Sequence, residues 1–281
     1  MSALILVATP IGNLGDLSPR AIEQMRSAGL VCCEDTRRTG MLLHNLGIDA
    51  KMLRVDEHTE VQSITRVLDV LNQGRDVCLV TDAGSPGISD PGSRLVASVI
   101  EHGYDVSAVP GPTALIMALT MSGLPTDRFV FDGFLPRKGS ERTTRLREVG
   151  QQSRTTVLYE APHRLLRTLE DLVQSCGGER LIAVCRELTK IHEEVWRGTT
   201  SEAVEYFTEH EPQGEFVLVI AGAPSPLPAT STDIDRALTG LLTDGSSTRD
   251  AATQVSELLG ISKKSAYERA LQLQAELKTS N

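Results

Sequence analysis

Short, continuous runs of apolar residues are the feature that most constrains the fold of this 281-residue chain. Within residues 1–122 the runs are ALILVAT, LVCCED, KMLRV, DVCLVTD and DVSAVP, and an amphipathic stretch follows each of them. Strands that are covered on both faces need continuous rather than alternating apolar residues. The pattern therefore predicts a parallel α/β domain in residues 1–122, built from strand–helix–strand crossovers.

Polar residues indicate where helices of this domain begin. Ser18, followed by Pro19, is typical of a helix cap and a first helical residue. We expect Thr59 to cap a second helix, and Asp90, followed by Pro91, to cap a third.

A second alternation of strands and helices occupies residues 123–222. The segments FVFDGF, TTVLYE, RLIAVCREL and GEFVLVIAG predict strands, and HRLLRTLEDLVQSCG predicts a helix that ends at a glycine cap. We expect a second, mixed α/β domain here. Residues 223–232 are rich in proline and small residues, which is typical of a linker, and residues 233–281 predict a helical tail.

The composition excludes some classes of protein and partner. A formal net charge of -9 disfavours non-specific adhesion of nucleic acid to the whole surface, although local basic patches could still bind it. The apolar start of the chain has no basic stretch before it, and no apolar run is long enough to cross a bilayer. Five cysteines without a Cys-x-x-Cys pair favour reduced thiols. We therefore expect a cytoplasmic protein with no membrane segment and no metal site.

The loop TDAGSPGISDPG, residues 81–92, follows a predicted strand and carries two aspartates but no lysine. A phosphate about 4 Å from Asp82 would meet a repulsion of about 4 kcal/mol at an effective dielectric constant of about 20. Asp82 favours instead a ligand that is cationic or offers hydroxyls, and the glycines let backbone groups approach it closely. The structural alternatives are that Asp82 is a turn residue and that Asp90 is a helix cap.

Three further loops, TPIGNLGD, CEDTRRT and PGPTA, also follow predicted strands. In an open parallel sheet the ligand lies beyond the carboxyl ends of the strands. The four loops together therefore predict a cleft at that edge.

Seven blocks of sequence follow one another from about residue 4 onward. They are ATPIGNLGDLSPRA, CEDTRRTGMLL, LVTDAGSPGISDPG, VPGPTALIMAL, GLPTDRFVFDGFLPRK, YEAPHRLLRTLEDL and CRELTK. These blocks resemble the signature of the tetrapyrrole methylase superfamily and, within it, of the bacterial enzymes that methylate a cytidine 2'-hydroxyl in small-subunit (16S) ribosomal RNA. The resemblance implies two α/β domains with S-adenosylmethionine in the cleft between them, and a homodimer. The sulfonium of that cofactor is a cation, which gives Asp82 without a lysine a physical reason.

The resemblance also implies which residues hold the cofactor. In the loops of the first domain these are Pro10, Asp82, Ala83, Gly84, Ser85, Gly111, Thr113 and Ala114. From the second domain the resemblance adds Tyr159 and the segment around Arg186 and Glu187.

Methyl transfer to a ribose hydroxyl needs an in-line approach, a group that accepts the proton, and exclusion of water. The candidates for the proton-handling group are Glu160, His163, Glu187 and Lys190. Each could instead form an ion pair with a neighbouring charged residue, and His163 could simply open the following helix. We predict that Lys190 or Glu187 accepts the proton or orients the hydroxyl, with Glu160 as a further candidate.

Three basic features could contact RNA. Arg37 in CEDTRRT is the first; alternatively, Thr36 caps the next helix while Arg37 and Arg38 pair with the preceding acids. The second is the segment 135–150, whose local positive excess could place Arg137 and Lys138 on phosphates from a loop.

The third is the tail segment VSELLGISKKSAYERAL, which resembles a helix-turn-helix. Ala266, Ala270 and Leu271 are expected to point inward. Lys263 and Lys264, together with Arg269, lie where a recognition helix would face a groove. Neighbouring acids leave open a compact helical pair without a nucleic-acid function.

The expected protein is thus an α/β, tetrapyrrole-methylase-like enzyme with two α/β domains and a small C-terminal helix-turn-helix-like domain. We expect it to use S-adenosylmethionine to methylate a cytidine ribose of ribosomal RNA, free or in the assembled small subunit. One alternative is a tetrapyrrole (precorrin or porphyrin) C-methyltransferase, which would need neither the basic segment nor the tail. The other is a DNA-binding regulator that senses a small molecule, although its basic surface would be thin.

Overall fold

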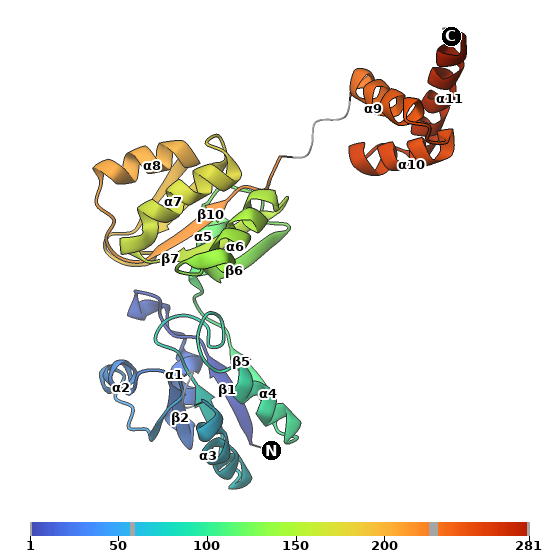
Figure 1. Ribbon diagram of the computed structural model, residues 1–281. Coiled ribbons are helices and arrows are strands. Elements are labelled where there is room, and N and C mark those ends of the chain that lie inside the picture. Colours follow the sequence, from blue (N-terminus) through green and yellow to red (C-terminus); the bar gives the residue numbers. More distant parts are fainter. Residues whose placement is uncertain (1, 57–59, 225–229, 280–281) are drawn as a thin grey trace. The chain divides into compact units, whose positions relative to one another are not determined.

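The computed structural model describes residues 2–56, 60–224 and 230–279 (Figure 1). Contacts divide the chain into two compact units, residues 1–223 and 224–281. The first unit holds two five-stranded sheets. The predicted boundary at residue 122 falls between these sheets and stays a prediction, and the predicted linker, 223–232, includes residues 225–229, which lie outside the described residues.

The first sheet is parallel throughout, with the strand order β3-β2-β4-β1-β5. Its strands are β1 (Ala3–Val7), β2 (Leu30–Cys33), β3 (Met52–Arg54), β4 (Val77–Leu79) and β5 (Asp105–Val109). The helices of this region are α1 (Pro19–Ser27), α2 (Thr36–Asn45), α3 (Glu60–Asn72), α4 (Ser93–Glu101) and α5 (Ala114–Met121), and a short 3-10 turn, η1, spans Leu14–Asp16.

Alternate residues of these strands enter two separate cores, which is why the apolar runs are continuous. Val7 and Val31 pack with residues of α1 and α2 on one face. Leu4 and Cys32 pack with residues of α3 and α4 on the other. The prediction of a parallel sheet covered on both faces is confirmed.

The helix caps follow the sequence pattern only in part. Ser18 accepts a hydrogen bond from the backbone of Ala21 and Pro19 is the first residue of α1, as predicted. Thr59 lies outside the described residues. The prediction for Asp90 is wrong, because α4 begins at Ser93 and its N-cap position is Gly92.

Gly92 explains why the helix starts late. Its φ is +131°, and a Cβ atom at this position would lie 2.7 Å from Cδ2 of Leu79. The chain therefore needs a glycine to turn here. The turn lies after Pro91, so Asp90 stays in the preceding loop.

The second sheet is mixed, with the order β6-β7-β10-β8-β9. Its strands are β6 (Phe129–Phe134), β7 (Thr155–Glu160), β8 (Leu181–Arg186), β9 (Glu194–Thr199) and β10 (Phe216–Ile220), and its helices are α6 (Gly139–Gln151), α7 (Pro162–Cys176) and α8 (Thr200–Glu209). Within this sheet, as far as the structure describes it, only the β6–β7 pair is parallel, and the other three strand pairs are antiparallel. The predicted glycine cap is confirmed, since α7 ends at Gly177, with φ +85°. Sequence analysis did not predict β9, an edge strand in which charged residues interrupt the apolar pattern.

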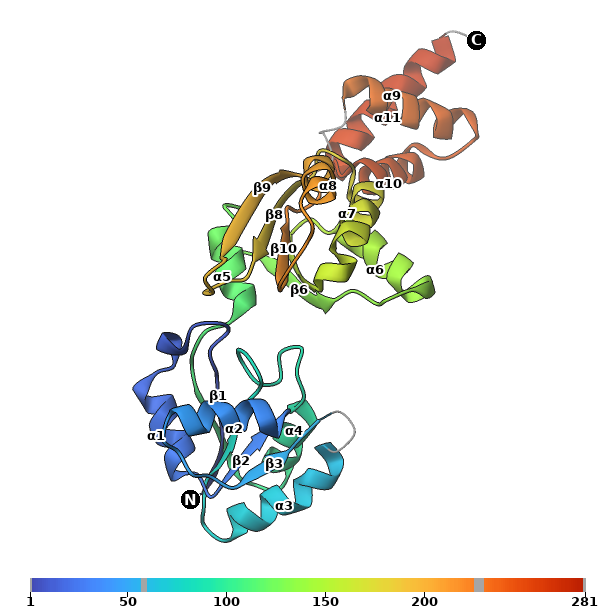
Figure 2. The ribbon, with the colours of Figure 1, turned by 90° about the vertical axis from the view of Figure 1, so that its left-hand side faces the viewer.

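The two faces of the second sheet have different covers. Helices α6, α7 and α8 pack on one face, around Leu158 and Leu218. The other face packs against α5, which follows the last strand of the first sheet (Figure 2). Leu115 and Leu119 of α5 share a buried cluster with Val157 and Val217. This contact brings the loops of the first sheet to the second sheet.

The second unit consists of α9 (Ser231–Thr243), α10 (Thr248–Leu259) and α11 (Lys263–Thr279). Ala266 and Ala270 are fully buried, as predicted. The prediction for Leu271 is wrong: it is 45% exposed, and Leu273 is buried instead. The reason is helical spacing, because positions 266, 270 and 273 lie on one face of α11 while 271 lies beside it.

Arg269 forms an ion pair inside the second unit. Its Nε and Nη2 donate to the carboxylate of Asp235 in α9 at 2.6 and 2.7 Å. The pair joins α9 to α11, and the prediction that Arg269 faces a groove stays a prediction. Lys263 and Lys264 are exposed at the start of α11.

Candidate active site

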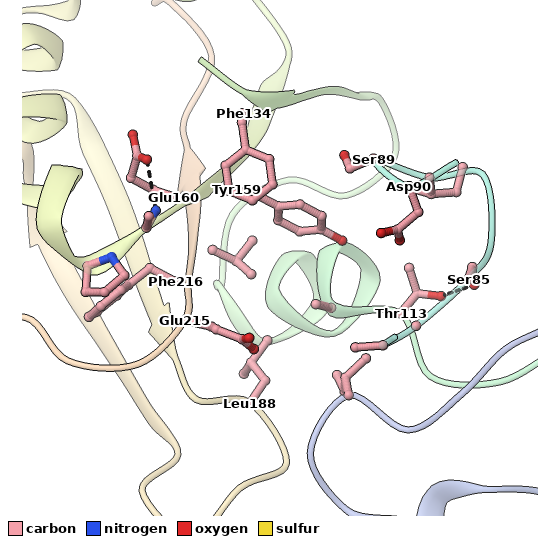
Figure 3. Close-up of a pocket in the computed structure, with 18 residues that line it drawn as sticks. Ser85, Ser89, Asp90, Thr113, Phe134, Tyr159, Glu160, Leu188, Glu215 and Phe216 are labelled. Carbon is pink, nitrogen blue, oxygen red and sulfur yellow. Dashed lines mark hydrogen bonds between the residues drawn. The ribbon is translucent and has the colours of Figure 1, made fainter. Parts of the chain in front are cut away.

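A cavity of about 310 Å³ lies in the first unit, beyond the carboxyl ends of the strands of the first sheet (Figure 3). Loops after β1, β4 and β5 form one side, and β6, β7, β10 and the segment after β8 form the other. The lining residues are Ile11, Ala83, Gly84, Ser85, Ile88, Ser89, Asp90, Thr113, Ala114, Phe134, Tyr159, Glu160, Ala161, Pro162, Leu188, Glu215, Phe216 and Val217. Most of the residues that the sequence predicts to bind the cofactor are in this set: Ala83, Gly84, Ser85, Thr113, Ala114 and Tyr159.

Hydrogen bonds connect three loops at the carboxyl ends of the strands of the first sheet. Thr9 and Gly84 exchange backbone hydrogen bonds of 2.9 and 3.0 Å, so the loop after β1 pairs with the loop after β4. The hydroxyls of Ser85 and Thr113 lie 2.9 Å apart, which joins the loop after β4 to the start of α5. The positive φ of Gly84, +83°, shapes the loop at the point where it borders the cavity.

The remaining predicted cofactor residues lie outside the cavity lining, as far as the described residues form it. They are Pro10, Asp82, Gly111 and Arg186. Gly111 backs onto the first loop, since a Cβ atom there would lie 2.9 Å from Cβ of Ala8. Arg186 donates to the carbonyl oxygen of Gln213 at 2.7 Å and pairs with Glu194 at 3.5 Å.

Asp82 connects the loop after β4 to the loop after β2. Its carboxylate accepts a hydrogen bond from the backbone of Asp35 at 3.3 Å and pairs with Arg38 at 3.4 Å. Arg37 pairs with Asp35 at 2.7 Å, and its side chain is 87% exposed. Asp35, not Thr36, caps α2, because its carboxylate accepts from the backbone of Arg37. The prediction of Thr36 as the cap is therefore wrong.

Aromatic side chains form the wall of the cavity on the side of the second sheet. Tyr159 makes edge contacts with Phe131 and Phe134, at ring-centroid distances of 4.9 and 5.6 Å. Phe134 is 52% exposed. Burial raises the pKa of Tyr159, and the charge of Asp90 adds to this rise, while a hydrogen bond with the backbone of Leu115 opposes it. The phenol therefore stays protonated at neutral pH.

Neighbouring groups of the fold hold the carboxylate of Glu160 in place. Its carboxylate accepts hydrogen bonds from the backbone of Ala161 at 2.9 Å and from the hydroxyl of Thr168 at 2.6 Å. It also pairs with Arg164 at 3.3 Å and is buried. These contacts favour the ion-pair interpretation of Glu160. His163 is exposed in the first turn of α7, which agrees with the alternative that it opens that helix.

Glu187 and Lys190 form an ion pair with each other. Lys190 Nζ donates to Glu187 at 2.7 Å and to Glu215 at 3.0 Å, and Glu187 also accepts from the backbone of Glu215 at 2.9 Å. Burial acts to lower the pKa of Lys190, but its two carboxylate partners outweigh burial and raise it. Lys190 therefore holds its proton at neutral pH, which favours an orienting or structural role over proton acceptance.

Two glycines make this segment possible. A Cβ atom at Gly214 would lie 2.5 Å from the carboxyl group of Glu187, and one at Gly12 would lie 2.4 Å from Cγ of Lys190. Gly12 belongs to the loop after β1, so the side chains of Lys190 and Thr189 from the segment after β8 pack directly against its backbone. The neighbouring residues Ile11 and Leu188 line the cavity.

The predicted basic segment, 135–150, is helical from Gly139 onward, and its first four residues form a loop. Arg137 and Lys138 are exposed just before α6. Arg142 is buried and bonded to Asp171 and Thr168. The local positive excess that faces solvent is therefore smaller than the sequence indicates.

Asp90 is the functional candidate that sequence analysis assigned to another role. Its carboxylate and the hydroxyl of Tyr159 point toward each other at the cavity (Figure 3). The signal that could have identified it is Gly92, a glycine that fits a tight turn better than the first turn of a helix.

A family model described as "Tetrapyrrole (Corrin/Porphyrin) Methylases" matches residues 3–204. The chain belongs to this family. A second model, "RsmI C-terminal HTH domain", matches residues 228–274. The helix-turn-helix resemblance of the tail is thereby confirmed.

Close relatives of this family member carry one name, "Ribosomal RNA small subunit methyltransferase I". The protein of Synechocystis sp. is 47% identical over 98% of this chain and 100% of its own length. The protein of Pseudomonas aeruginosa is 41% identical over 97% of this chain and 98% of its own length. The protein of Thermotoga maritima is 42% identical over 222 residues, which is 79% of this chain and 99% of that protein.

Solved structures share the fold at low sequence identity. A uroporphyrin-III C-methyltransferase from Thermus thermophilus, complexed with S-adenyl homocysteine, has a TM-score of 0.55 and 18% identity, and the match covers 79% of this chain and 97% of that chain. A cobalt precorrin-4 methyltransferase has a TM-score of 0.59 and 16% identity, covering 80% and 96%. The predicted tetrapyrrole-methylase-like fold is confirmed.

Replacing Glu187 with glutamine tests the ion pair with Lys190. Burial acts to raise the pKa of Glu187, but hydrogen bonds from Lys190 and the backbone of Glu215 outweigh it and lower the pKa. A group with a lowered pKa stabilises the fold above its unfolded pKa, and that stability is lost as the pH falls through its folded pKa. Glu187→Gln should therefore lower the free energy of unfolding by about 1 kcal/mol at pH 7, and by less below about pH 4.

Urea denaturation at several pH values measures this difference. Glu170→Gln, an exposed change on α7, is the matched control and should leave stability unchanged at each pH. An equal loss for Glu187→Gln at pH 3 and pH 7 would show that the ion pair does not stabilise the fold.

Proposed function

We propose that this protein transfers the methyl group of S-adenosylmethionine to the 2'-hydroxyl of a cytidine in small-subunit (16S) ribosomal RNA. The observation that carries the proposal is the near full-length similarity to proteins named ribosomal RNA small subunit methyltransferase I, 47% identical in Synechocystis sp.. The C-terminal match to the "RsmI C-terminal HTH domain" supports the same function. The oxygen of the substrate and the site of methylation are part of the proposal.

The cavity suits a cofactor with a cationic sulfur. Carboxylates of Glu34, Asp82 and Asp90 lie close enough to influence one another, and the loop between β4 and α4 contains no lysine. Ala114 and Val217 offer apolar surface. The bound cofactor would supply an electrophilic methyl group. The residues proposed to hold it are Pro10, Asp82, Ala83, Gly84, Ser85, Gly111, Thr113, Ala114, Tyr159 and Arg186.

Exposed cations in both units are proposed to contact the RNA backbone. Arg137 and Lys138 precede α6, and Lys263 and Lys264 begin α11. Arg37 is a further candidate that would have to exchange Asp35 for phosphate. Phosphate contacts of this kind supply affinity without reading sequence.

A cytoplasmic homodimer is also proposed. The five cysteines are free thiols. Among residues 2–56, 60–224 and 230–279, every helix is too short or too polar to span a lipid bilayer. The dimer rests on the family resemblance, and analytical ultracentrifugation would decide it.

Methyl transfer from radiolabelled S-adenosylmethionine tests the proposed function directly. The acceptors are assembled small subunits, naked 16S ribosomal RNA, duplex DNA and a uroporphyrinogen. We expect 2'-O-methylcytidine in the RNA or the subunit and no transfer to DNA or tetrapyrrole. Transfer to the tetrapyrrole alone would instead establish the rival C-methyltransferase.

Gly84→Val should weaken the binding of S-adenosylmethionine at least tenfold, about 1.4 kcal/mol, because it places a side chain where the backbone borders the cavity. Gly74→Val is the matched control. Gly74 also has a positive φ, +76°. It lies between α3 and β4, near the amino end of β4 and therefore away from the carboxyl ends that border the cavity. Isothermal calorimetry measures the affinity and thermal melting compares the folds. Equal affinities in the two variants would contradict the cofactor assignment.

Neutralising Arg137 and Lys138 to glutamine should reduce the slope of log affinity for RNA against log salt by up to about 1.8, with the B-DNA value as a guide. Cofactor affinity should stay the same, because neither residue lines the cavity. Arg154→Gln with Arg167→Gln, at other positions of the second sheet region, controls for the loss of two charges. An unaltered salt slope would mean that other surfaces hold the RNA.

A further inference from the structure

Tyr267 is an exposed aromatic side chain far along the chain from the cavity residues. Among the Phe, Tyr and Trp side chains, each of which the structure describes, only Phe134 and Tyr267 are exposed, by 52% and 42%. Phe134 lines the cavity, whereas Tyr267 belongs to α11 in the second unit. Tyr267 is therefore the exposed ring whose role the cavity does not explain.

One face of α11, here called the α11 face, consists of Lys263, Lys264, Tyr267 and Leu271. These positions lie on one side of the helix because they are three, four, seven or eight residues apart. Leu271 is 45% exposed, and both lysines are exposed. The acid nearest in sequence, Glu268, lies four residues after Lys264 and on the side of Lys264 away from Tyr267. The α11 face is therefore cationic and partly apolar.

Contacts inside the second unit fix which side of α11 is covered. Ala266, Ala270 and Leu273 are buried in a cluster with residues of α9 and α10. Arg269 pairs with Asp235 of α9 and so holds the helix in this rotation. The α11 face is thereby left on the outside of the second unit.

The composition of the α11 face favours RNA over a protein partner. Single-stranded nucleic acid is bound by cations, which hold phosphates, together with an aromatic ring, on which a base stacks. Two half-exposed apolar side chains offer much less than the roughly 800 Å² per partner that a stable protein interface buries. Lys263 and Lys264 also lie in the first turn of α11, where the helix dipole disfavours cations and no acid offsets them. A bound phosphate would offset that cost.

A ring on this helix fits an unpaired base better than a duplex groove. The major groove of A-form RNA is too deep and narrow for side chains to read, so a helix that reads DNA in this way cannot read an RNA duplex. Unpaired bases in loops and at ends expose the faces on which aromatic rings stack. Tyr267 lies between Lys263 and Leu271 on the α11 face, so a base on the ring places its phosphates within reach of the lysines.

We propose that Tyr267 stacks on an unpaired base of the RNA substrate while Lys263 and Lys264 hold the adjoining phosphates. This inference rests on the proposed action on RNA. The helix-turn-helix then selects single-stranded RNA instead of reading a duplex groove. It supplies affinity without contacting the reacting atoms.

Binding of a fluorescently labelled single-stranded RNA of about 12 nucleotides to the full chain tests the stacking. Tyr267→Ala should weaken the affinity about 5- to 100-fold, whereas Tyr267→Phe keeps the ring and should bind as wild type. Leu258→Ala is the matched control, because it removes a 75% exposed leucine of α10 in the same unit, and it should leave the affinity unchanged. An RNA duplex of the same length should bind equally to Tyr267→Ala and to wild type.

Tyr267→Trp reports the stacking directly. The natural chain has a single tryptophan, Trp196, which contacts Tyr206 and Phe207 beside the second sheet. The single-stranded RNA should quench the emission of Tyr267→Trp and leave the emission of the wild type unchanged. Lys263→Gln with Lys264→Gln should reduce the slope of log affinity against log salt by up to about 1.4, the value for two contacts to a single strand.

Four results would overturn the proposal. They are wild-type affinity of Tyr267→Ala for the single strand, an equal loss in Leu258→Ala, failure of the wild type to bind the single strand at low salt, and altered sedimentation or melting of Tyr267→Ala without RNA. The last would show that the protein itself covers the α11 face. Methyl transfer to small subunits is measured separately. Transfer by the wild type with unchanged binding by Tyr267→Ala refutes this contact alone, whereas the expected binding without methylation of any RNA refutes the proposed function alone.

Discussion

The buried contact between α5 and the second sheet is the interaction on which the site depends. Leu115 and Leu119 lie on the helix that follows the last strand of the first sheet, yet they pack against Val157 and Val217 of the second. Burial of leucine-sized side chains stabilises such a contact by about 1.5–3 kcal/mol each. Because Ile11 of the first loop joins the same cluster, the loops at the edge of one sheet are fixed against the face of the other. The cavity is the space that this packing leaves.

Charges around the cavity fall into two groups with different physical roles. Glu160 and Glu187 each have a cation and at least one backbone or hydroxyl donor, and such groups hold loops and strands in place. The acids on the other side differ: burial and the charges of Asp90 and Asp82 raise the pKa of Glu34, and burial and the charge of Asp82 raise that of Asp90. A protein tolerates such repulsion where a positive ligand or a proton offsets it. One side of the cavity thus carries paired carboxylates that support the fold, and the other carries carboxylates whose ionised forms are disfavoured.

The sequence predicted the elements well and the contacts between them poorly. Continuous apolar runs identified the strands of the first sheet, because a strand buried on both faces has a simple signature. The same reasoning missed β9, whose exposed edge position tolerates Arg197 and Glu194. It made Asp90 a helix cap because aspartate before proline is typical of one, whereas α4 begins at Ser93 with Gly92 at the N-cap position. Pairings such as Arg269 with Asp235 depend on which helices meet, and local sequence does not encode that.

The close approach of the loop after β1 to the segment after β8 depends on the absence of a side chain at Gly12. The loop after β1 and the segment after β8 touch at this position, and the space there is already filled by Lys190 and Thr189. A methyl group here would have to displace these side chains, so the contact between the two segments requires glycine. A residue outside the cavity lining thus sets how closely Ile11 and Leu188, which do line it, can approach each other.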